Sequence, residues 1–108
     1  MSYNVLLTNH AAQDLDDMYE FIYLSDSPGK AEYVFMQIEK AIDSLTTFPE
    51  SGSYPNELKS LGIKQYREVF FKPYRLIYQI KKETVYIMLV TDGRRDMQTL
   101  LSKRLLEV

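Results

Sequence analysis

The residues best suited to chemistry in this chain of 108 residues are its five arginines, which all lie between positions 67 and 104. A guanidinium group keeps its charge and can donate two parallel hydrogen bonds to one phosphate or carboxylate. We expect Arg67, Arg75 and one of Arg94 or Arg95 to converge on a concave basic patch that engages an anion. The alternative is structural ion pairing with nearby acids, namely Glu68, Asp92 and Asp96.

Charge is divided unevenly along the chain. Residues 1–63 carry three basic and ten acidic groups, whereas residues 64–108 carry ten basic and five acidic groups. A basic half beside an acidic half favours binding to an anion or to an acidic partner. The overall formal charge is only −2, and we therefore expect no general or sequence-specific DNA binding by this chain alone.

Several classes of site are excluded by the residues at hand. The chain has no cysteine and a single histidine, and a metal site needs several converging ligands. We expect His10 to be an ordinary exposed polar residue and predict neither a metal nor a cofactor. No nucleophile elbow, phosphate-binding loop, dinucleotide fingerprint or HExxH pattern occurs. The sequence therefore gives no support for the interpretation as an ordinary metabolic enzyme.

The length predicts a single domain spanning residues 1–108. No apolar run is long enough to cross a membrane, and the first residues lack the basic and apolar regions of a signal peptide. The absence of cysteine suits a reducing compartment. We expect a cytoplasmic protein that does not contact membranes.

Two helices are predicted to position the acidic half. Residues 3–7 favour a buried or half-buried strand, and a helix then begins at a cap formed by Thr8 or Asn9. A second helix starts at Ser27-Pro28 and ends before Phe48-Pro49. Each has an apolar stripe at helical spacing, which for the first comprises Ala11, Leu15, Met18, Tyr19, Ile22 and Tyr23.

The apolar side chains of this hairpin allow two interpretations. In one, they are simply the core. In the other, they exceed what a small sheet can cover and form a groove for a partner helix, because methionine and tyrosine suit adaptable binding surfaces. The residues expected to contact such a partner are Met18, Tyr19, Ile22 and Tyr23.

The period of the pattern changes to two after a loop predicted at residues 49–64. Segments 65–71, 74–81 and 84–91 predict three strands, whose short connections require an antiparallel meander. The third strand is apolar at both parities and is expected in the centre, covered on both faces. A helix capped by Asp96 follows over residues 97–106. The order β-α-α-β-β-β-α predicts an α+β fold with the helical hairpin packed on a small, mainly antiparallel sheet.

Four tyrosines alternate with the arginines in these strands. Aromatic rings beside guanidinium groups could stack on bases. Strands also favour tyrosine for packing alone, and this is the preferred interpretation for Tyr66, Tyr74, Tyr78 and Tyr86.

The chain resembles the RelE/ParE superfamily of bacterial type II toxins along nearly its whole length. The order and spacing of several short segments carry the resemblance together. They are Asp14-Leu15, Phe48-Pro49-Glu50-Ser51-Gly52, Tyr66-Arg67-Glu68, Pro73-Tyr74-Arg75-Leu76-Ile77-Tyr78, Val85-Tyr86-Ile87, Gly93-Arg94-Arg95-Asp96, Leu100-Leu101 and Arg104-Leu105.

The resemblance implies a toxin bound by a cognate antitoxin, and the family divides by mechanism. RelE-like members cleave mRNA on the ribosome, and Arg67, Arg75 and Arg95 match positions that hold the phosphate there. Cleavage also needs an acid and a base, for which Glu68 is the only weak candidate. ParE-like members poison DNA gyrase, and the long hairpin and the Gly-Arg-Arg-Asp end favour this branch.

The leading hypothesis is therefore a non-enzymatic gyrase inhibitor. Its functional patch would comprise Arg67, Arg75, Arg94 and Arg95. The alternative is a ribosome-dependent mRNA endoribonuclease. A third possibility is an inactive member kept for antitoxin binding and autoregulation.

Overall fold

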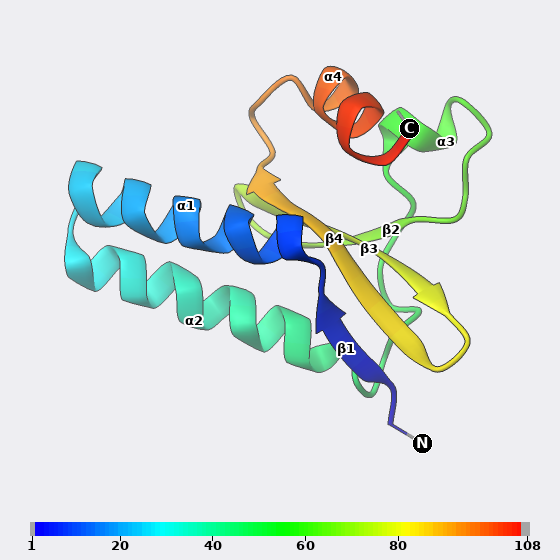
Figure 1. Ribbon diagram of the computed structural model, residues 1–108, viewed down its shortest axis with the longest axis horizontal. Coiled ribbons are helices and arrows are strands. Elements are labelled where there is room, and N and C mark those ends of the chain that lie inside the picture. The colour runs from blue at the N-terminus through cyan, green and yellow to red at the C-terminus, as the bar shows by residue number, and fades with distance from the viewer. Residues whose placement is uncertain (1, 107–108) are drawn as a thin grey trace.

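The computed structural model describes residues 2–106 and contains one four-stranded sheet with helices on both faces (Figure 1). The strands are arranged in the order β1-β4-β3-β2. This α+β fold confirms the predicted order of elements and adds a short helix, α3, in the segment predicted as loop. The elements are β1 (Asn4–Leu7), α1 (Asn9–Ser25), α2 (Pro28–Ser44), α3 (Asn56–Lys59), β2 (Arg67–Phe71), β3 (Tyr74–Lys81), β4 (Thr84–Asp92), α4 (Met97–Leu101) and the π-helix η1 (Ser102–Leu106).

Side-chain caps begin three of the helices, as the sequence predicts. Thr8, Ser27 and Asp96 each accept a hydrogen bond from the backbone N–H three residues later, at 3.1, 3.0 and 3.2 Å. Each bond satisfies a donor that has no partner within the helix. Pro28 occupies the first turn of α2, where its missing N–H removes no helical hydrogen bond.

The first strand lies at an edge of the sheet. β1 pairs in parallel with β4, from Asn4 opposite Thr84 to Leu7 opposite Ile87, while β2, β3 and β4 form the expected antiparallel meander. Leu6 and Leu7 are exposed. Tyr3 and Val5 are half-buried and pack against the core. Residues 3–7 therefore form the half-buried strand that the sequence allowed, and not a fully buried one.

The central strand β4 is covered on both faces, as its apolar sequence predicts. Val85, Ile87 and Val90 pack in the core beneath the α1–α2 hairpin. Leu89 instead packs with α3 and α4 on the opposite face, in the cluster that contains Leu58. Side chains of a strand normally alternate between its two faces. Adjacent residues are therefore expected to face opposite cores, but Ile87 and Leu89, which are two residues apart, should share a face.

A β-bulge explains this change of face. Ile77 on β3 pairs with Leu89, whereas the next residue, Tyr78, pairs with Ile87, so Met88 is an extra residue on β4. An inserted residue shifts the alternation of every side chain that follows it. The bulge thereby also reverses which backbone groups of β4 point toward β3 and which point away from it.

The outer edge of β2 is protected by the segment after α2. Ser53 forms an isolated antiparallel bridge with Glu68. The buried Tyr78 hydroxyl donates to the Pro49 carbonyl at 2.6 Å and accepts from the Gly52 N–H at 3.0 Å. The segment predicted as a loop is therefore fixed to the sheet.

The hairpin is longer than the sheet that it covers. α1 and α2 continue past the end of β4, so the tip of the hairpin overhangs the sheet (Figure 1). Among the described residues, no helix is both long and apolar enough to span a bilayer.

Gly93 allows the chain to pass close to Arg75, and we expect alanine to disrupt this contact. A Cβ atom at position 93 would lie 2.6 Å from Cδ of Arg75 and 3.0 Å from the Pro73 carbonyl oxygen. Overpacking of this kind lowers the free energy of unfolding by about 1–3 kcal/mol. Gly93→Ala should therefore unfold at a lower urea concentration than the wild type. The control is Gly29→Ala, where no atom lies within 4 Å; an equal loss in both variants would contradict the steric explanation.

Candidate functional site

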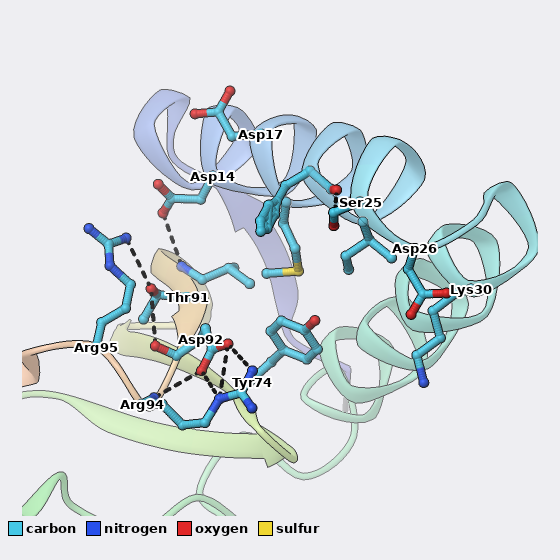
Figure 2. A pocket seen from close by; sticks show the side chains of 14 residues that line it. Asp14, Asp17, Ser25, Asp26, Lys30, Tyr74, Thr91, Asp92, Arg94 and Arg95 are labelled. Atoms are coloured by element: carbon cyan, nitrogen blue, oxygen red, sulfur yellow. Dashed lines mark hydrogen bonds and ion pairs between the residues drawn. The ribbon is translucent and has the colours of Figure 1, made fainter.

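A concavity among the described residues lies beneath the overhanging hairpin. It is bounded above by α1 and below by the start of β3, the end of β4 and the turn that follows (Figure 2). Its volume is about 600 Å³. We call it the overhang groove; it is lined by Asp14, Asp17, Met18, Phe21, Ile22, Ser25, Asp26, Lys30, Tyr74, Val90, Thr91, Asp92, Arg94 and Arg95.

Two of the predicted arginines reach this groove, and their surroundings differ. Arg94 binds the Asp92 carboxylate at 2.6 Å while remaining 76% exposed, and this bond lowers the pKa of Asp92. Arg95 is exposed, and its hydrogen bond is a long one of 3.4 Å to the Thr91 hydroxyl. Arg95 is therefore the groove arginine that is most available to a partner.

Asp14, one of the lining residues, forms a half-buried ion pair with Arg104 that the sequence did not reveal. Asp14 binds Arg104 through two bonds of 2.9 and 3.0 Å. Asp14 also accepts from the Val90 N–H at 3.0 Å, and Arg104 donates to the Met88 carbonyl at 3.1 Å. These are backbone groups of β4 that lie beyond the last pair with β1. The two side chains thus provide hydrogen-bond partners for backbone groups of β4 that β1 does not reach.

One sequence signal could have found this pair. Asp14 lies three residues after Ala11 and one before Leu15 on α1, within the face that is buried. A carboxylate on an apolar stripe needs a partner, because burying an unpaired charge is costly. The identity of that partner could not be read from the spacing.

Arg75 is part of a carboxylate–guanidinium–carboxylate cluster on the α3 side of the sheet. It donates to both oxygens of Glu57 at 2.8 Å and to Glu68 at 2.7 Å. Its side chain is 11% exposed and that of Glu68 is 5% exposed. The hydrogen bonds from Arg75 lower the pKa of Glu57, whereas burial raises that of Glu68. The structural-pairing alternative therefore describes Arg75.

Arg67 lies on the opposite face of the sheet from Arg75. On β2, Arg67 pairs with Tyr78 and Phe70 pairs with Arg75, and residues an odd number apart on a strand face opposite sides. Arg67 donates to the Gly52 carbonyl at 2.9 Å and its guanidinium lies 4.7 Å from the ring centre of Tyr54. The predicted convergence of Arg67 and Arg75 on one patch was therefore wrong, and a functional role for Arg94 and Arg95 stays a prediction.

The four hairpin residues expected to contact a partner are not equivalent. Ile22 is buried in the core. Tyr19 lies between the helices, where its hydroxyl donates to Glu32 at 2.7 Å and its ring packs edge-on against Phe35. Met18 is half-buried and lines the groove, and Tyr23 is exposed.

The most exposed apolar residues of α1 were missed by the stripe analysis. Phe21 is 60% exposed and lines the groove, and Leu24 is 73% exposed near the tip. Both lie off the helical stripe, in the last two turns of α1. The length by which the hairpin extends past the sheet (Figure 1) is a tertiary property and could not be predicted from periodicity.

Two of the four strand tyrosines serve packing. Tyr66 and Tyr78 are buried in the cores on opposite faces. Tyr74 lines the groove and its partial burial raises its pKa.

His10 is exposed, and no group of three or more potential metal ligands occurs in residues 2–106.

Comparison with known proteins gives a consistent result. The family model described as the ParE toxin of the type II toxin–antitoxin system parDE matches residues 5–97. Toxin ParE3 of Caulobacter vibrioides is 25% identical over 100 residues, covering 93% of this chain and 96% of that protein.

Solved structures share the fold. The chromosomal ParDE toxin–antitoxin system of P. aeruginosa aligns with a TM-score of 0.70 at 19% identity, covering 84% of this chain and 96% of that chain. A mutant of the E. coli toxin RelE in its free state aligns with a TM-score of 0.65 at 15% identity, covering 97% and 99%. The RelBE2 toxin–antitoxin complex of Mycobacterium tuberculosis gives 0.56 at 22% identity, covering 85% and 99%.

Proposed function

This chain belongs to the ParE family of toxins of type II toxin–antitoxin systems, and from that premise we propose that it arrests growth by binding DNA gyrase. Its activity would be silenced by a cognate antitoxin encoded beside it. The match to the ParE model and the likeness to Toxin ParE3 support this branch over the RelE branch. Binding, not bond cleavage, would then be the function of the exposed surface.

The proposal rests on the bonds made by the residues that cleavage would require. Glu68, the only acid–base candidate, is buried and bonded to Arg75. Arg67 donates to the carbonyl of Gly52. General acid–base groups must reach the proton that they transfer, and groups held in internal bonds of this kind are poorly placed to do so. A protein-binding role needs no such pair.

The proposal is tested by assaying the purified toxin on two targets in parallel. We expect inhibition of gyrase supercoiling, with gyrase-dependent DNA cleavage, and intact mRNA on translating ribosomes. The physical reason is that loss of acid–base assistance forfeits about 10²–10⁴-fold in the rate of cleavage. Codon-specific cuts in ribosome-bound mRNA, with gyrase unaffected, would instead establish the endoribonuclease alternative. Inactivity in both assays would leave antitoxin binding as the retained function.

The overhang groove is the proposed antitoxin site. Met18 and Phe21 on α1 provide apolar side chains to its lining. A groove of this kind suits an amphipathic helix that inserts apolar anchors at helical spacing. This placement retains Met18 from the sequence analysis and replaces Ile22 with Phe21.

We expect Phe21→Asp to weaken antitoxin binding by about 2 kcal/mol or more, because a central aromatic anchor contributes most to such interfaces. The measurement is calorimetric titration of the neighbouring gene product into the folded variant. The matched control is Met36→Asp, which changes an apolar residue of α2 that is 51% exposed and does not line the groove. Similar losses in both variants would place the antitoxin elsewhere.

A further inference from the structure

We propose that the antitoxin helix in the overhang groove carries opposite charges on its two flanks. The flank that faces α1 is basic, and the flank that faces the turn after β4 is acidic. This inference rests on the proposal that the groove is the antitoxin site, and it specifies the chemistry that this site selects. It does not depend on whether gyrase or the ribosome is the target of the toxin.

The wall of the groove formed by α1 is acidic. This helix carries four carboxylates and neither lysine nor arginine. Of the two carboxylates that line the groove, Asp14 is bonded to Arg104. Asp17 is exposed, accepts from the uncharged amide of Gln13 at 2.8 Å and forms no ion pair within residues 2–106. Asp17 is therefore the carboxylate of this wall that can pair with a partner.

The opposite wall is basic, because the acids of its turn are already bonded. The Asp92 carboxylate binds Arg94 at 2.6 Å. Asp96 accepts from the N–H and the hydroxyl of Thr99 at 3.2 and 2.9 Å and so caps α4. Arg95 is exposed, forms no ion pair with any described residue and comes from the wall opposite α1 (Figure 2). The free charge of this wall is therefore positive.

The end of the groove at the hairpin turn does not alter this polarity. Asp26 follows α1 and Lys30 lies in the first turn of α2, and both line the groove. They contribute one charge of each sign at the same end (Figure 2). The separation of charge therefore runs across the groove, from one wall to the other.

A helix bound in this groove presents one flank to each wall. Met18 and Phe21 supply apolar contacts to the lining, and an amphipathic helix seats its apolar stripe on such side chains. Beside Asp17, a lysine or arginine of the partner is attracted and a carboxylate is repelled. Beside Arg95 the preference is reversed. A helix that is acidic on both flanks is therefore opposed at the α1 wall.

Unlike walls also select the direction of the bound helix. Reversing that direction, with the apolar stripe kept against the groove, exchanges the two flanks. A helix with unlike flanks is therefore attracted in one direction and repelled in the other, and specificity of this kind uses repulsion as well as attraction. The same charges discriminate against the antitoxin of another toxin whose flanks are exchanged.

Calorimetric titration of the neighbouring gene product into toxin variants tests the inference. Asp17→Lys and Arg95→Glu should each weaken binding about threefold to thirtyfold, because each turns an exposed attractive pair into a repulsive one. Asp17→Asn and Arg95→Gln remove the charge with little change of shape and should lose less. The fold of each variant is checked by circular dichroism.

The matched controls are Asp16→Lys and Lys64→Glu. They make the same changes in net charge at exposed residues that do not line the groove, and they should bind as the wild type does. Salt provides a second control, because the Debye length falls from about 8 Å at 0.15 M to about 3 Å at 1 M. The losses caused by Asp17→Lys and Arg95→Glu should shrink over this range, whereas the loss caused by Phe21→Asp should persist.

Compensating substitutions in the antitoxin identify the two flanks. One of its basic residues, when changed to glutamate, should restore binding to Asp17→Lys. One of its acidic residues, when changed to lysine, should restore binding to Arg95→Glu. The two residues should lie on opposite sides of the apolar stripe of a single helix.

Binding by Asp17→Lys or Arg95→Glu that is as tight as the wild type, or tighter, would overturn the inference. Equal losses in the controls, or two compensating residues on the same flank, would do the same. If Phe21→Asp bound as tightly as the wild type, the groove would not be the antitoxin site. A weakened Phe21→Asp beside a tighter Asp17→Lys would instead leave the site in place and remove only its selection of charge.

Discussion

Replacing Arg75 with alanine is expected to lower the free energy of unfolding by about 3–5 kcal/mol, the cost of removing one partner from a buried ion pair. The replacement leaves Glu57 and the buried Glu68 facing each other without a cation. It also removes the side chain against which Gly93 packs. The measurement is equilibrium urea unfolding followed by far-ultraviolet circular dichroism at neutral pH.

Arg95→Ala is the matched comparison, because it removes the same side chain from a surface position. Its long bond to Thr91 predicts a change within about 0.5 kcal/mol. If the two variants had equal stability and only Arg75→Ala lost toxicity, Arg75 would be a functional residue despite its pairing. A loss of toxicity in Arg95→Ala without loss of stability would support a functional surface at the groove.

Ile22→Asp is expected to destabilise the protein by about 4 kcal/mol or more, because it places an unpaired charge in an apolar core. Ile22 is only 9% exposed and packs in the cluster beneath the hairpin. The expected observation is loss of the cooperative unfolding transition at ambient temperature. Weaker antitoxin binding by this variant would follow from unfolding, so Ile22 does not report on the groove directly.

The neighbouring substitution Phe21→Asp provides the contrast. It introduces the same group one residue earlier, at a side chain that is 60% exposed, and its expected effect on stability is within about 0.5 kcal/mol. Two variants of equal stability would mean that the two positions are equally exposed in solution, contrary to the arrangement of α1 described above.

Local patterns predicted most elements of this fold. The caps at Thr8, Ser27 and Asp96 are chemical signals contained in a few residues, and the change of hydrophobic period separated the hairpin from the meander. Even the central position of β4 followed from its apolar residues at both parities, because only a strand covered on both faces tolerates them.

Features that depend on distant pairing escaped prediction. The parallel partner of β1 is set by packing across the whole chain, and so is its place at the edge of the sheet. The bulge at Met88 has no clear local signal, yet it decides which face each later residue of β4 occupies. The opposite orientations of Arg67 and Arg75 depend on register, which a hydrophobic pattern alone does not specify at the level of one residue.

The candidate site was predicted in part for the same reason. Met18, Arg94 and Arg95 do line the overhang groove, since sequence places them on the first helix and after the last strand. Phe21 was missed because a residue off the stripe is normally solvated, and only the length of the hairpin relative to the sheet makes its position useful.

The parallel pairing of β1 with β4 has a consequence for the order of folding. Asn4 pairs with Thr84, and contacts between such distant residues form slowly because a long loop must close first. The α1–α2 hairpin, in contrast, is built from neighbouring segments and can be present on the nascent chain before β4 has been synthesised. The overhang groove, however, needs the start of β3 and the end of β4 as its second wall, so it is complete only after the last strand has paired. A partner that recognises this groove therefore meets a toxin whose sheet has already formed.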